Sequence, residues 1–384
     1  MRPLSVVDVG NPRALWEPLS QALFDGGPAI LPRPGGARIS HTAPLEVADD
    51  VAVVIETSGT TGAPKRVALS ADAILAGAHM THNALGAGGT WLLALPAHYI
   101  AGVQVCVRAH LSGTEPIFLH PEPFSSTAIA GKSAELDVAA EGGALYTSLV
   151  PAQLRRLMED ARQMPVLQRV LQRFDAILVG GQALPTALYA QALEAGLRVR
   201  RTYGSSETAG GCVWDGVALP GVEIAEWEGR IALSGPMVAS GYLENPEKTA
   251  TSFVEREGKR WYLTDDQGAI DSAGLLSVTG RVDDVMISGG VKVSLAEIER
   301  VIQHSTPAHD GVVVAAPSET WGQVPVLVTT VSVDLEQIRA MLATAIGPHA
   351  RVERFIQVAE IPLLGSGKPD RVSLHTLAQA GLRG

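Results

Sequence analysis

A nine-residue run of hydroxyl side chains, glycines and one lysine is the part of the sequence best suited to bind phosphate. It comprises Thr57-Ser-Gly-Thr-Thr-Gly-Ala-Pro-Lys65, and it follows an apolar, β-branched stretch, residues 51–57, that predicts a buried strand. The glycines allow the backbone to approach a ligand, the hydroxyl groups donate hydrogen bonds, and the lysine adds positive charge. The Gly-Lys-Ser/Thr of a Walker A loop is absent. We therefore predict a phosphate loop of another kind, with a solvated turn as the alternative.

Two later strings place carboxylates where they would suit a nucleotide. Tyr203-Gly-Ser-Ser-Glu-Thr208 follows a stretch with a strand pattern, and its glutamate offers the oxygen ligands that Mg²⁺ prefers. Tyr262-Leu-Thr-Asp-Asp266 presents two adjacent aspartates, and one carboxylate can accept hydrogen bonds from both hydroxyl groups of a ribose. Taken alone, Glu207 would more often be a surface acid, and the alternative for the two aspartates is an acidic turn. Their order behind the phosphate loop favours a shared site.

Three further strings lie in the last third of the chain: Gly280-Arg-Val-Asp-Asp284, Ser288-Gly-Gly290 and Pro362-Leu-Leu-Gly-Ser-Gly-Lys368. The two glycines at 289–290 would by themselves indicate a hairpin turn. A lysine in a loop of glycine and serine is usually solvated. These strings acquire a chemical interpretation only from their place in the whole series.

In their order, these motifs resemble the adenylate-forming superfamily of acyl-CoA synthetases, peptide-synthetase adenylation domains and luciferases, over about residues 50–371. The resemblance implies ATP and coenzyme A as substrates, Mg²⁺ as cofactor and an acyl-adenylate intermediate. It implies that Lys368, Glu207 and Lys65 are catalytic and that Glu207 binds the Mg²⁺. The residues implied to bind ATP or AMP are Thr57, Ser58, Gly59, Thr60, Thr61, Gly62, Lys65, Gly181, Gln182, Tyr203, Gly204, Ser206, Thr208, Asp266 and Arg281.

The resemblance also implies a hinge at Asp283 and a loop, Gly289 and Gly290, that approaches the thiol of coenzyme A. At two positions this sequence departs from the family pattern. Asp265 stands where glycine is usual, so the choice of Asp266 as the ribose ligand rests on register. Arg66 also stands where glycine usually follows the lysine of the phosphate loop.

The phosphate loop begins at residue 57, whereas most members of the superfamily have a much longer segment before it. In this short form the sequence is similar to the actinobacterial o-succinylbenzoate–CoA ligases of menaquinone biosynthesis. That similarity implies a dianionic aromatic acid as substrate, with His98, Thr147 and Arg201 as candidate donors to its aromatic carboxylate. The residues expected to line the acyl site are His98, Tyr146, Thr147, Gly210 and Gly211. Another acyl- or aryl-CoA ligase, a stand-alone adenylation enzyme that loads a carrier protein, and a nucleotide-binding protein without catalysis stay open.

The elements that must position these motifs alternate between strand and helix up to about residue 205. Such alternation predicts a parallel sheet with flanking helices. Short strands after Gly221 predict a small antiparallel or barrel-like part, and a compact α+β pattern follows residue 284. We therefore expect an α/β fold with a shortened N-terminal domain, 1–280, and a small mobile C-terminal domain, 281–384, after a hinge at 281–283. Expected strands lie at 51–57, 91–96, 117–119, 144–147, 176–180, 197–204, 311–316, 324–332 and 352–358, and expected helices at 71–85, 101–111, 151–160, 185–195, 294–304 and 335–346.

Composition narrows the class of protein. The 384 residues carry a net charge of −10, which argues against non-specific nucleic-acid binding. The two cysteines are too few for a disulfide framework and are expected to be buried thiols in a reducing cytoplasm. The longest apolar region, 91–111, is interrupted by polar residues and predicts no membrane span. The expected partner is a small carboxylic acid, and a homodimer is left open.

Overall fold

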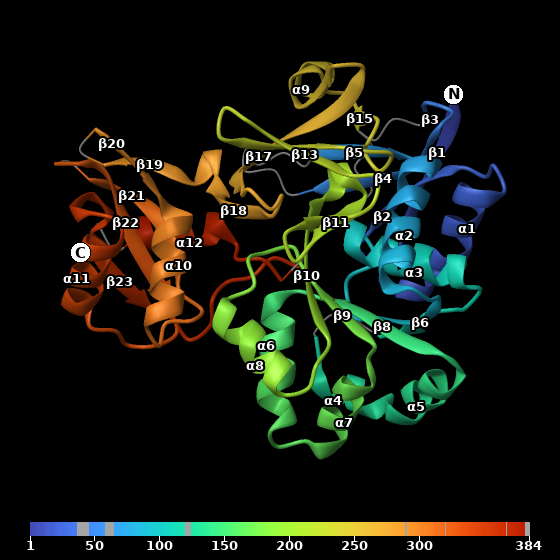
Figure 1. Cartoon of the computed structure of the whole chain (residues 1–384), viewed down its shortest axis with the longest axis horizontal. Helices are drawn as coiled ribbons and strands as arrows, with labels where there is room; N and C mark the ends of the chain where they lie inside the picture. Colours follow the sequence, from blue (N-terminus) through green and yellow to red (C-terminus); the bar gives the residue numbers. More distant parts are fainter. Residues whose placement is uncertain are drawn as a thin grey trace.

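Figure 1 shows the computed structural model of the chain, in which the blue-to-yellow part forms a large body and the orange-to-red part forms a smaller body beside it. The red C-terminal segment extends from the smaller body towards strand β10 of the larger one. The structure describes residues 1–36, 46–57, 65–119, 124–288, 290–318, 320–365 and 367–380, and of Asp283 it describes the backbone alone.

The first sheet has the strand order β15-β5-β4-β2-β1-β3. Strands β1, β2 and β4 are parallel, and β5 runs antiparallel to β4 with Thr57 opposite Lys65. This pairing places the two ends of the predicted phosphate loop on adjacent strands. The strands are β1 (Arg2–Asp8), β2 (Ala29–Arg33), β3 (Glu46–Val47), β4 (Val51–Thr57), β5 (Lys65–Ser70) and β15 (Gly241–Tyr242).

The second sheet has the order β12-β11-β10-β9-β8-β6-β7, of which β7, β6, β8, β9 and β10 are parallel. The loops after β8 and β9 therefore leave the same edge of the sheet. The strands are β6 (Gly89–Leu93), β7 (Ile117–Phe118), β8 (Ala144–Leu149), β9 (Ala176–Val179), β10 (Val199–Ser205), β11 (Gly210–Trp214) and β12 (Val217–Ala218).

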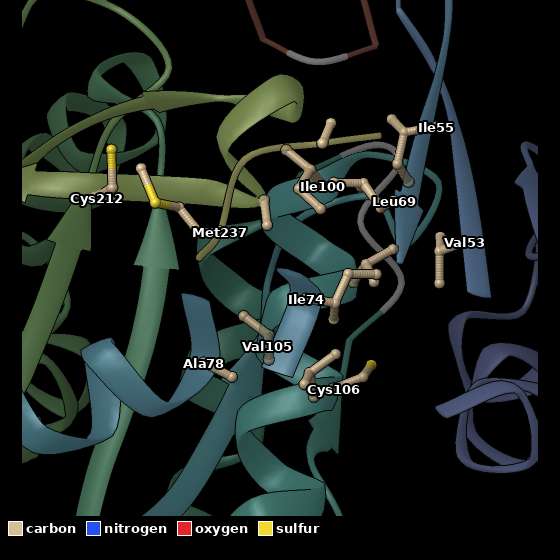
Figure 2. Close-up of a cluster of buried hydrophobic side chains, with 14 of the residues drawn as sticks. Val53, Ile55, Leu69, Ile74, Ala78, Ile100, Val105, Cys106, Cys212 and Met237 are labelled. Carbon is tan, nitrogen blue, oxygen red and sulfur yellow. The ribbon is translucent and has the colours of Figure 1, made fainter. Parts of the chain in front are cut away.

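Helices α2 (Ala71–Leu85) and α3 (Ile100–Ser112) pack against each other between these two sheets, and one apolar core joins the helices to both sheets (Figure 1). Figure 2 shows part of this core, with Ile55 and Leu69 from the first sheet beside Ile74 of α2 and Val105 of α3. Both cysteines, Cys106 and Cys212, are buried free thiols there, as predicted. Two helices precede α2 in the chain, the 3₁₀ helix η1 (Pro12–Leu15) and α1 (Trp16–Phe24).

The opposite face of the second sheet is covered by five helices that pack through a separate apolar cluster. They lie below the sheet in Figure 1. The helices are α4 (Ser126–Gly131), α5 (Ser133–Gly142), α6 (Pro151–Ala161), α7 (Pro165–Arg173) and α8 (Thr186–Glu194). A parallel sheet with helices on both faces is the α/β arrangement that the alternating pattern predicts.

A third sheet is antiparallel, as predicted. It carries the motif at 262–266 and the first two residues of the motif at 280–284. Its order is β13-β14-β17-β16, and β18 pairs with β17 so that Asp266 lies opposite Arg281. The elements are β13 (Glu223–Trp227), β14 (Arg230–Ser234), α9 (Pro246–Ser252), β16 (Phe253–Arg256), β17 (Lys259–Ile270) and β18 (Leu276–Arg281).

The C-terminal sheet has the order β20-β19-β22-β21, with β23 parallel to β22, and has its own apolar core. It follows the 3₁₀ helix η3 (Val282–Asp284), close to the predicted division at 281–283, which stays a prediction. The elements are β19 (Val285–Ser288), β20 (Val291–Ser294), α10 (Leu295–Ser305), β21 (Val312–Ser318), β22 (Gly322–Thr329), α11 (Leu335–Ala345), η4 (Pro348–Ala350), β23 (Arg354–Gln357) and α12 (Arg371–Ala380).

The expected elements are present within a few residues of their predicted bounds, and Ser70 caps α2 by accepting a hydrogen bond from the Ala73 N–H at 3.1 Å. One difference concerns residues 91–96, because β6 ends at Leu93 and the chain turns before Pro96. A second is β5, a strand that the sequence analysis did not name. Among the described residues, no helix has both the length and the apolar surface required to cross a bilayer.

Candidate nucleotide and acyl site

The carboxylate of Asp266 lies between a tyrosine and an arginine. The Tyr203 hydroxyl donates a hydrogen bond to Asp266 Oδ2 at 2.8 Å, and Arg281 Nη1 donates to Oδ1 at 3.1 Å. Burial raises the pKa of Asp266, while Tyr203 and Arg281 act in the opposite direction. Burial, together with the nearby Asp266, raises the pKa of the Tyr203 phenol, so the phenol keeps its proton at neutral pH and can donate to Asp266.

The neighbouring Asp265 is held on another side of the strand. Arg230 Nη2 lies 3.0 Å from Asp265 Oδ1, and Lys248 lies 3.9 Å from Oδ2. Because successive side chains of a strand point to opposite faces, only one of the two aspartates can face Tyr203. The geometry therefore supports the register argument that selects Asp266.

Glu207 is a buried carboxylate at the end of β10, within the 3₁₀ helix η2 (Ser206–Thr208). The Tyr242 hydroxyl donates to Glu207 Oε1 at 2.9 Å. The Thr208 hydroxyl donates to the Gly210 carbonyl at 2.9 Å and closes the turn. Gly204 is required there, because a Cβ atom at this residue would lie 2.0 Å from the Gly210 oxygen.

The donor chemistry at Glu207 fits Mg²⁺. Within the described residues, no group of three or more His, Cys, Asp or Glu side chains could hold a metal. Mg²⁺ in nucleotide sites is usually bound by one or two carboxylates together with phosphate oxygens and water. Glu207 is a single buried carboxylate, and Tyr242 donates to only one of its two oxygens, Oε1. Its other oxygen receives no hydrogen bond from Tyr242, so Glu207 meets that requirement.

Lys65 lies beside the same tyrosine. Its Nζ is 5.9 Å from the centre of the Tyr242 ring, so Tyr242 contacts both the lysine that ends the phosphate loop and the carboxylate of Glu207. The Thr57 hydroxyl donates to the Lys65 carbonyl at 3.4 Å. The remaining predicted loop residues, Ser58, Gly59, Thr60, Thr61 and Gly62, lie outside the described part of the chain.

Arg66, the residue that departs from the family pattern, belongs to a chain of ion pairs behind the loop. Its Nε lies 3.0 Å from Glu56, and its Nη1 lies 2.8 Å from Glu244. Glu56 also receives two hydrogen bonds from the buried Arg33. Burial would raise the pKa of Glu56, but the hydrogen bonds from the two arginines outweigh burial and lower it. Arg66 therefore joins the strands on both sides of the loop.

Lys368 reaches these groups from the smaller body. It is close enough to Arg281, Asp266 and Glu207 for their charges to act on its ammonium group. Part of its side chain remains accessible to water, yet the surrounding protein desolvates the ammonium group. This desolvation, with repulsion by Arg281, lowers the pKa of Lys368, while the two carboxylates raise it. The side-chain amide of Gln182 donates to the carbonyl of the preceding residue, Gly367, at 2.9 Å.

The predicted coenzyme A loop is not near this group of residues. Gly289 lies outside the described residues, and Gly290 is an exposed turn residue with φ +81° between β19 and β20. In Figure 1 this hairpin lies on the outer side of the smaller body, away from β10 and β11. The side chain of Asp283, the predicted hinge, is also outside the described part.

The residues predicted for the acyl group have mixed surroundings. His98 is half-buried against the Tyr99 ring, and burial lowers the pKa of His98 to about 4, so it is neutral at pH 7. The Tyr146 hydroxyl donates to the Ala87 carbonyl at 3.2 Å, and the buried Thr147 hydroxyl donates to the Leu92 carbonyl at 3.0 Å. Both hydroxyl groups therefore have protein acceptors already.

Arg201, the charged candidate for the second carboxylate, lies on the outside of β10. Its Nε is 3.1 Å from Asp215, and its guanidinium lies 4.7 Å from the centre of the Tyr189 ring. About half of its side chain is exposed. This position does not favour Arg201 as a donor inside a substrate site.

A buried arginine that the sequence interpretation overlooked lies on α3. Arg108 is 6% exposed, packs 5.0 Å from the Trp91 ring centre and places Nη1 3.5 Å from the Ser148 hydroxyl. Among the described residues no carboxylate forms an ion pair with it, and its Nε is a buried donor without an acceptor. Burial lowers the pKa of Arg108 to about 9, so the group stays charged at neutral pH.

One turn before Arg108, Gln104 is fully buried and has an oxygen, Oε1, without a hydrogen-bond donor. Its Cγ lies 3.4 Å from the position a Cβ atom would take on Gly210, while Gly211 closely approaches Thr202. Buried polar groups are normally satisfied by protein or water, and the described residues supply no donor to Gln104 Oε1. The sequence did contain a signal, namely two polar residues four apart, Gln104 and Arg108, within the apolar stretch of 100–109.

Comparison with known proteins agrees with this arrangement. Residues 12–243 match the family described as AMP-binding enzyme, and residues 297–368 match the AMP-binding enzyme C-terminal domain. A probable 2-succinylbenzoate–CoA ligase of Mycobacterium tuberculosis is 36% identical over 391 residues, which cover 97% of each chain. A 2-succinylbenzoate–CoA ligase of Geobacillus kaustophilus is 30% identical over 390 residues, which cover 93% of this chain and 74% of that one.

Solved structures share the fold. MenE of E. coli, as a variant with bound OSB-AMS, has a TM-score of 0.76 at 24% identity and covers 99% of this chain and 88% of its own. The amide bond synthetase McbA from Marinactinospora thermotolerans has a TM-score of 0.74 at 23% identity, and the match covers 98% of this chain and 80% of McbA. At these identities the likeness concerns the fold.

The α/β fold and the order of the motifs define an adenylate-forming enzyme, and the predictions of that fold class and of a ligase are confirmed. The chain belongs to the AMP-binding enzyme family.

Proposed function

We propose that this enzyme joins o-succinylbenzoate to coenzyme A in two steps, through an acyl-adenylate, in the menaquinone pathway. The observation that carries the proposal is the pairing of two charged regions. Lys368, Glu207 and Asp266 interact electrostatically at one end. At the other end Gln104 lies against Gly210, and one turn further along α3 is Arg108, a buried cation for which the described residues supply no carboxylate partner. Family membership supports the adenylate step. The full-length likeness to ligases of 2-succinylbenzoate supports the acid.

In the first step, an oxygen of the substrate carboxylate attacks the α-phosphorus of ATP, and pyrophosphate leaves. The protein's contribution is to position the reactants and to neutralise charge. Asp266 would accept the ribose hydroxyl groups, with Tyr203 and Arg281 fixing its orientation. Lys65 and Lys368 would face the phosphates and the attacking carboxylate. Glu207 would hold Mg²⁺, which supplies further neutralisation of the phosphate oxygens when bound.

In the second step, the thiolate of coenzyme A attacks the acyl carbon and AMP leaves with the bonding electron pair. The hairpin of β19 and β20 lies on the outer side of the smaller body in this arrangement (Figure 1), so we infer that its glycine loop reaches the acyl group only after the smaller body turns. We place that rotation at Asp283. Movement of a domain between half-reactions is a recognised way of completing a catalytic site. ATP and coenzyme A are both cytoplasmic, so we place the reaction there.

The second carboxylate of the acid is the feature that Arg108 would recognise. o-Succinylbenzoate is a dianion, and one carboxylate remains after the other has been activated. A planar guanidinium forms paired hydrogen bonds with a carboxylate, and in a buried site such charge-assisted bonds are strong. Ser148 and Gln104 would supply further polar contacts at this end.

The test is AMP formation by the protein with ATP, Mg²⁺, coenzyme A and one acid at a time. We expect AMP with o-succinylbenzoate and background levels with benzoate, a medium-chain fatty acid or an amino acid. AMP with another acid would retain the mechanism and reject the pathway. A thiol acceptor other than coenzyme A would indicate an enzyme that loads a carrier protein. ATP binding without AMP release would reject catalysis.

A further inference from the structure

A short hairpin near the C-terminus carries Lys368. The Leu364 N–H donates to the Lys368 carbonyl and the Gly367 N–H donates to the Leu364 carbonyl, each at 2.8 Å. Leu363 and Pro369 form an isolated antiparallel bridge at its base. These contacts brace the hairpin internally, so a contact made at Gly367 also fixes the position of Lys368.

The tip of this hairpin rests on loops that follow two parallel strands of the larger body. Gln182, after β9, donates its side-chain amide to the Gly367 carbonyl at 2.9 Å. A Cβ atom on Gly367 would lie 2.8 Å from Val150 Cγ2, and one on Gly181 would lie 3.7 Å from Lys368 Cε. Glycine at 367 therefore permits the close approach, while a Cβ atom on Gly181 would only make ordinary contact with Lys368. Gln182 provides a directional bond across this approach.

The hydrogen bond of Gln182 joins parts of the chain 185 residues apart. It exists only while the hairpin occupies this position. A contact present in one of two arrangements shifts their populations by its own free energy, whereas a contact present in both shifts nothing. The sequence interpretation assigned Gln182 to the nucleotide, but its amide nitrogen is directed to the main chain of the smaller body.

We propose that Gln182 is a positioning residue that holds the Lys368 hairpin in the adenylate-forming arrangement and thereby sets the balance between the two half-reactions. This inference rests on the proposed two-step function. It assigns Gln182 a role in domain placement and leaves the contacts to ATP to other residues.

The test compares Gln182→Ala with the parent protein in each half-reaction. Adenylate formation is measured by pyrophosphate release in a single turnover without coenzyme A. Thioester formation is measured from supplied acyl-adenylate and coenzyme A. If the two arrangements exchange quickly, the ratio of the two rates is proportional to the ratio of the two populations. Loss of one neutral hydrogen bond should lower that ratio by about two- to tenfold, with the KM for ATP within about twofold.

The matched control is Gln172→Ala. That glutamine donates the same amide group to a main-chain carbonyl, Ala195, at 3.0 Å on the far side of the second sheet, and we expect the ratio to stay unchanged. Gln182→Glu should lower the ratio further, because a carboxylate would face the Gly367 carbonyl. Equal loss of both half-reactions, or a raised KM for ATP with the ratio unchanged, would overturn the proposal.

A measurement without any acid separates this inference from the proposed substrate. Hydrogen–deuterium exchange of peptides that cover 359–371 should become faster in Gln182→Ala and stay unchanged in Gln172→Ala. If o-succinylbenzoate supports no AMP formation but exchange responds in this way, the substrate is wrong and the contact stands. If exchange is the same in all three proteins, the positioning role is rejected.

Discussion

Replacing Arg108 by methionine should separate substrate recognition from folding stability. The side chain is buried, unpaired with any described carboxylate and charged at neutral pH. The drop in its pKa from 12.5 to about 9 corresponds to roughly 5 kcal/mol of desolvation that the fold tolerates. A residue that served stability alone would not be expected to carry this cost.

Arg108→Met should therefore lower activity while leaving the fold intact or more stable. Exchange of buried charges for apolar side chains is often neutral or stabilising by about 1–4 kcal/mol. Loss of a buried partner for the substrate carboxylate should cost about 2–5 kcal/mol, which lowers kcat/KM for o-succinylbenzoate by roughly 30- to 5,000-fold. The ester of the aromatic carboxylate lacks that charge and should be far less affected.

The assay is pyrophosphate release with the diacid and with its aromatic monoester, together with urea unfolding of each variant. Arg108→Lys should give an intermediate loss, because lysine keeps the charge without the planar pair of donors. Arg201→Met is the matched control. It should change the rate of pyrophosphate release with either acid by no more than about twofold, since exposed ion pairs contribute little. Equal loss for diacid and monoester, with a large fall in stability, would make Arg108 a structural residue and refute the reasoning.

Three further predictions follow from the same geometry. Lys368→Ala should reduce adenylate formation by at least about a hundredfold and spare thioester formation from supplied acyl-adenylate; equal loss of both would contradict its role. Arg66→Gly should cost about 1–2 kcal/mol of unfolding free energy at pH 7, and the cost should shrink as pH falls below 4.5, because Glu56 contributes its ion pairs only while ionised; a cost independent of pH in urea titrations would argue against the pairs. The parent protein should lose stability as the pH falls from 6.5 to 4, because His98 binds a proton in the unfolded chain but not when buried in the fold. His98→Gln should reduce this loss, and identical dependence of the melting temperature on pH in both proteins would exclude His98 as the cause.

The nucleotide end of the site was predictable because its ligands lie in short continuous strings. Tyr203, Glu207 and Asp266 each follow or occupy a strand that the apolar pattern predicts, and β17 and β18 then bring Asp266 opposite Arg281. The strand alternation also separates Asp266 from Asp265, which the sequence motif alone left ambiguous. What the sequence did not contain was the partner of Glu207, since Tyr242 enters through the pairing of β15 with β5, far along the chain.

The acyl end was less predictable because it depends on packing between layers. Thr147 and Tyr146 were expected to face the substrate from β8, but their hydroxyl groups are used by neighbouring carbonyls. Arg108 lies on a helix that is apolar on average, so its composition indicated core. Only the stacking of α3 against β6 and β8 places the guanidinium beside Trp91 and Ser148.

The distribution of charge explains how an acidic protein can act on anions. A net charge of −10 would repel ATP, coenzyme A and a diacid if charge were uniform. The cation of Lys368 instead lies within the electrostatic influence of Asp266 and Glu207, so positive charge is brought to the site by the hairpin itself. Withdrawal of the hairpin after adenylate formation would remove this positive charge from the leaving AMP. Release of AMP should accordingly be slower in a variant whose hairpin is covalently fixed to the larger body than in the parent enzyme, and comparable release rates would show that the lysine has no part in retaining the product.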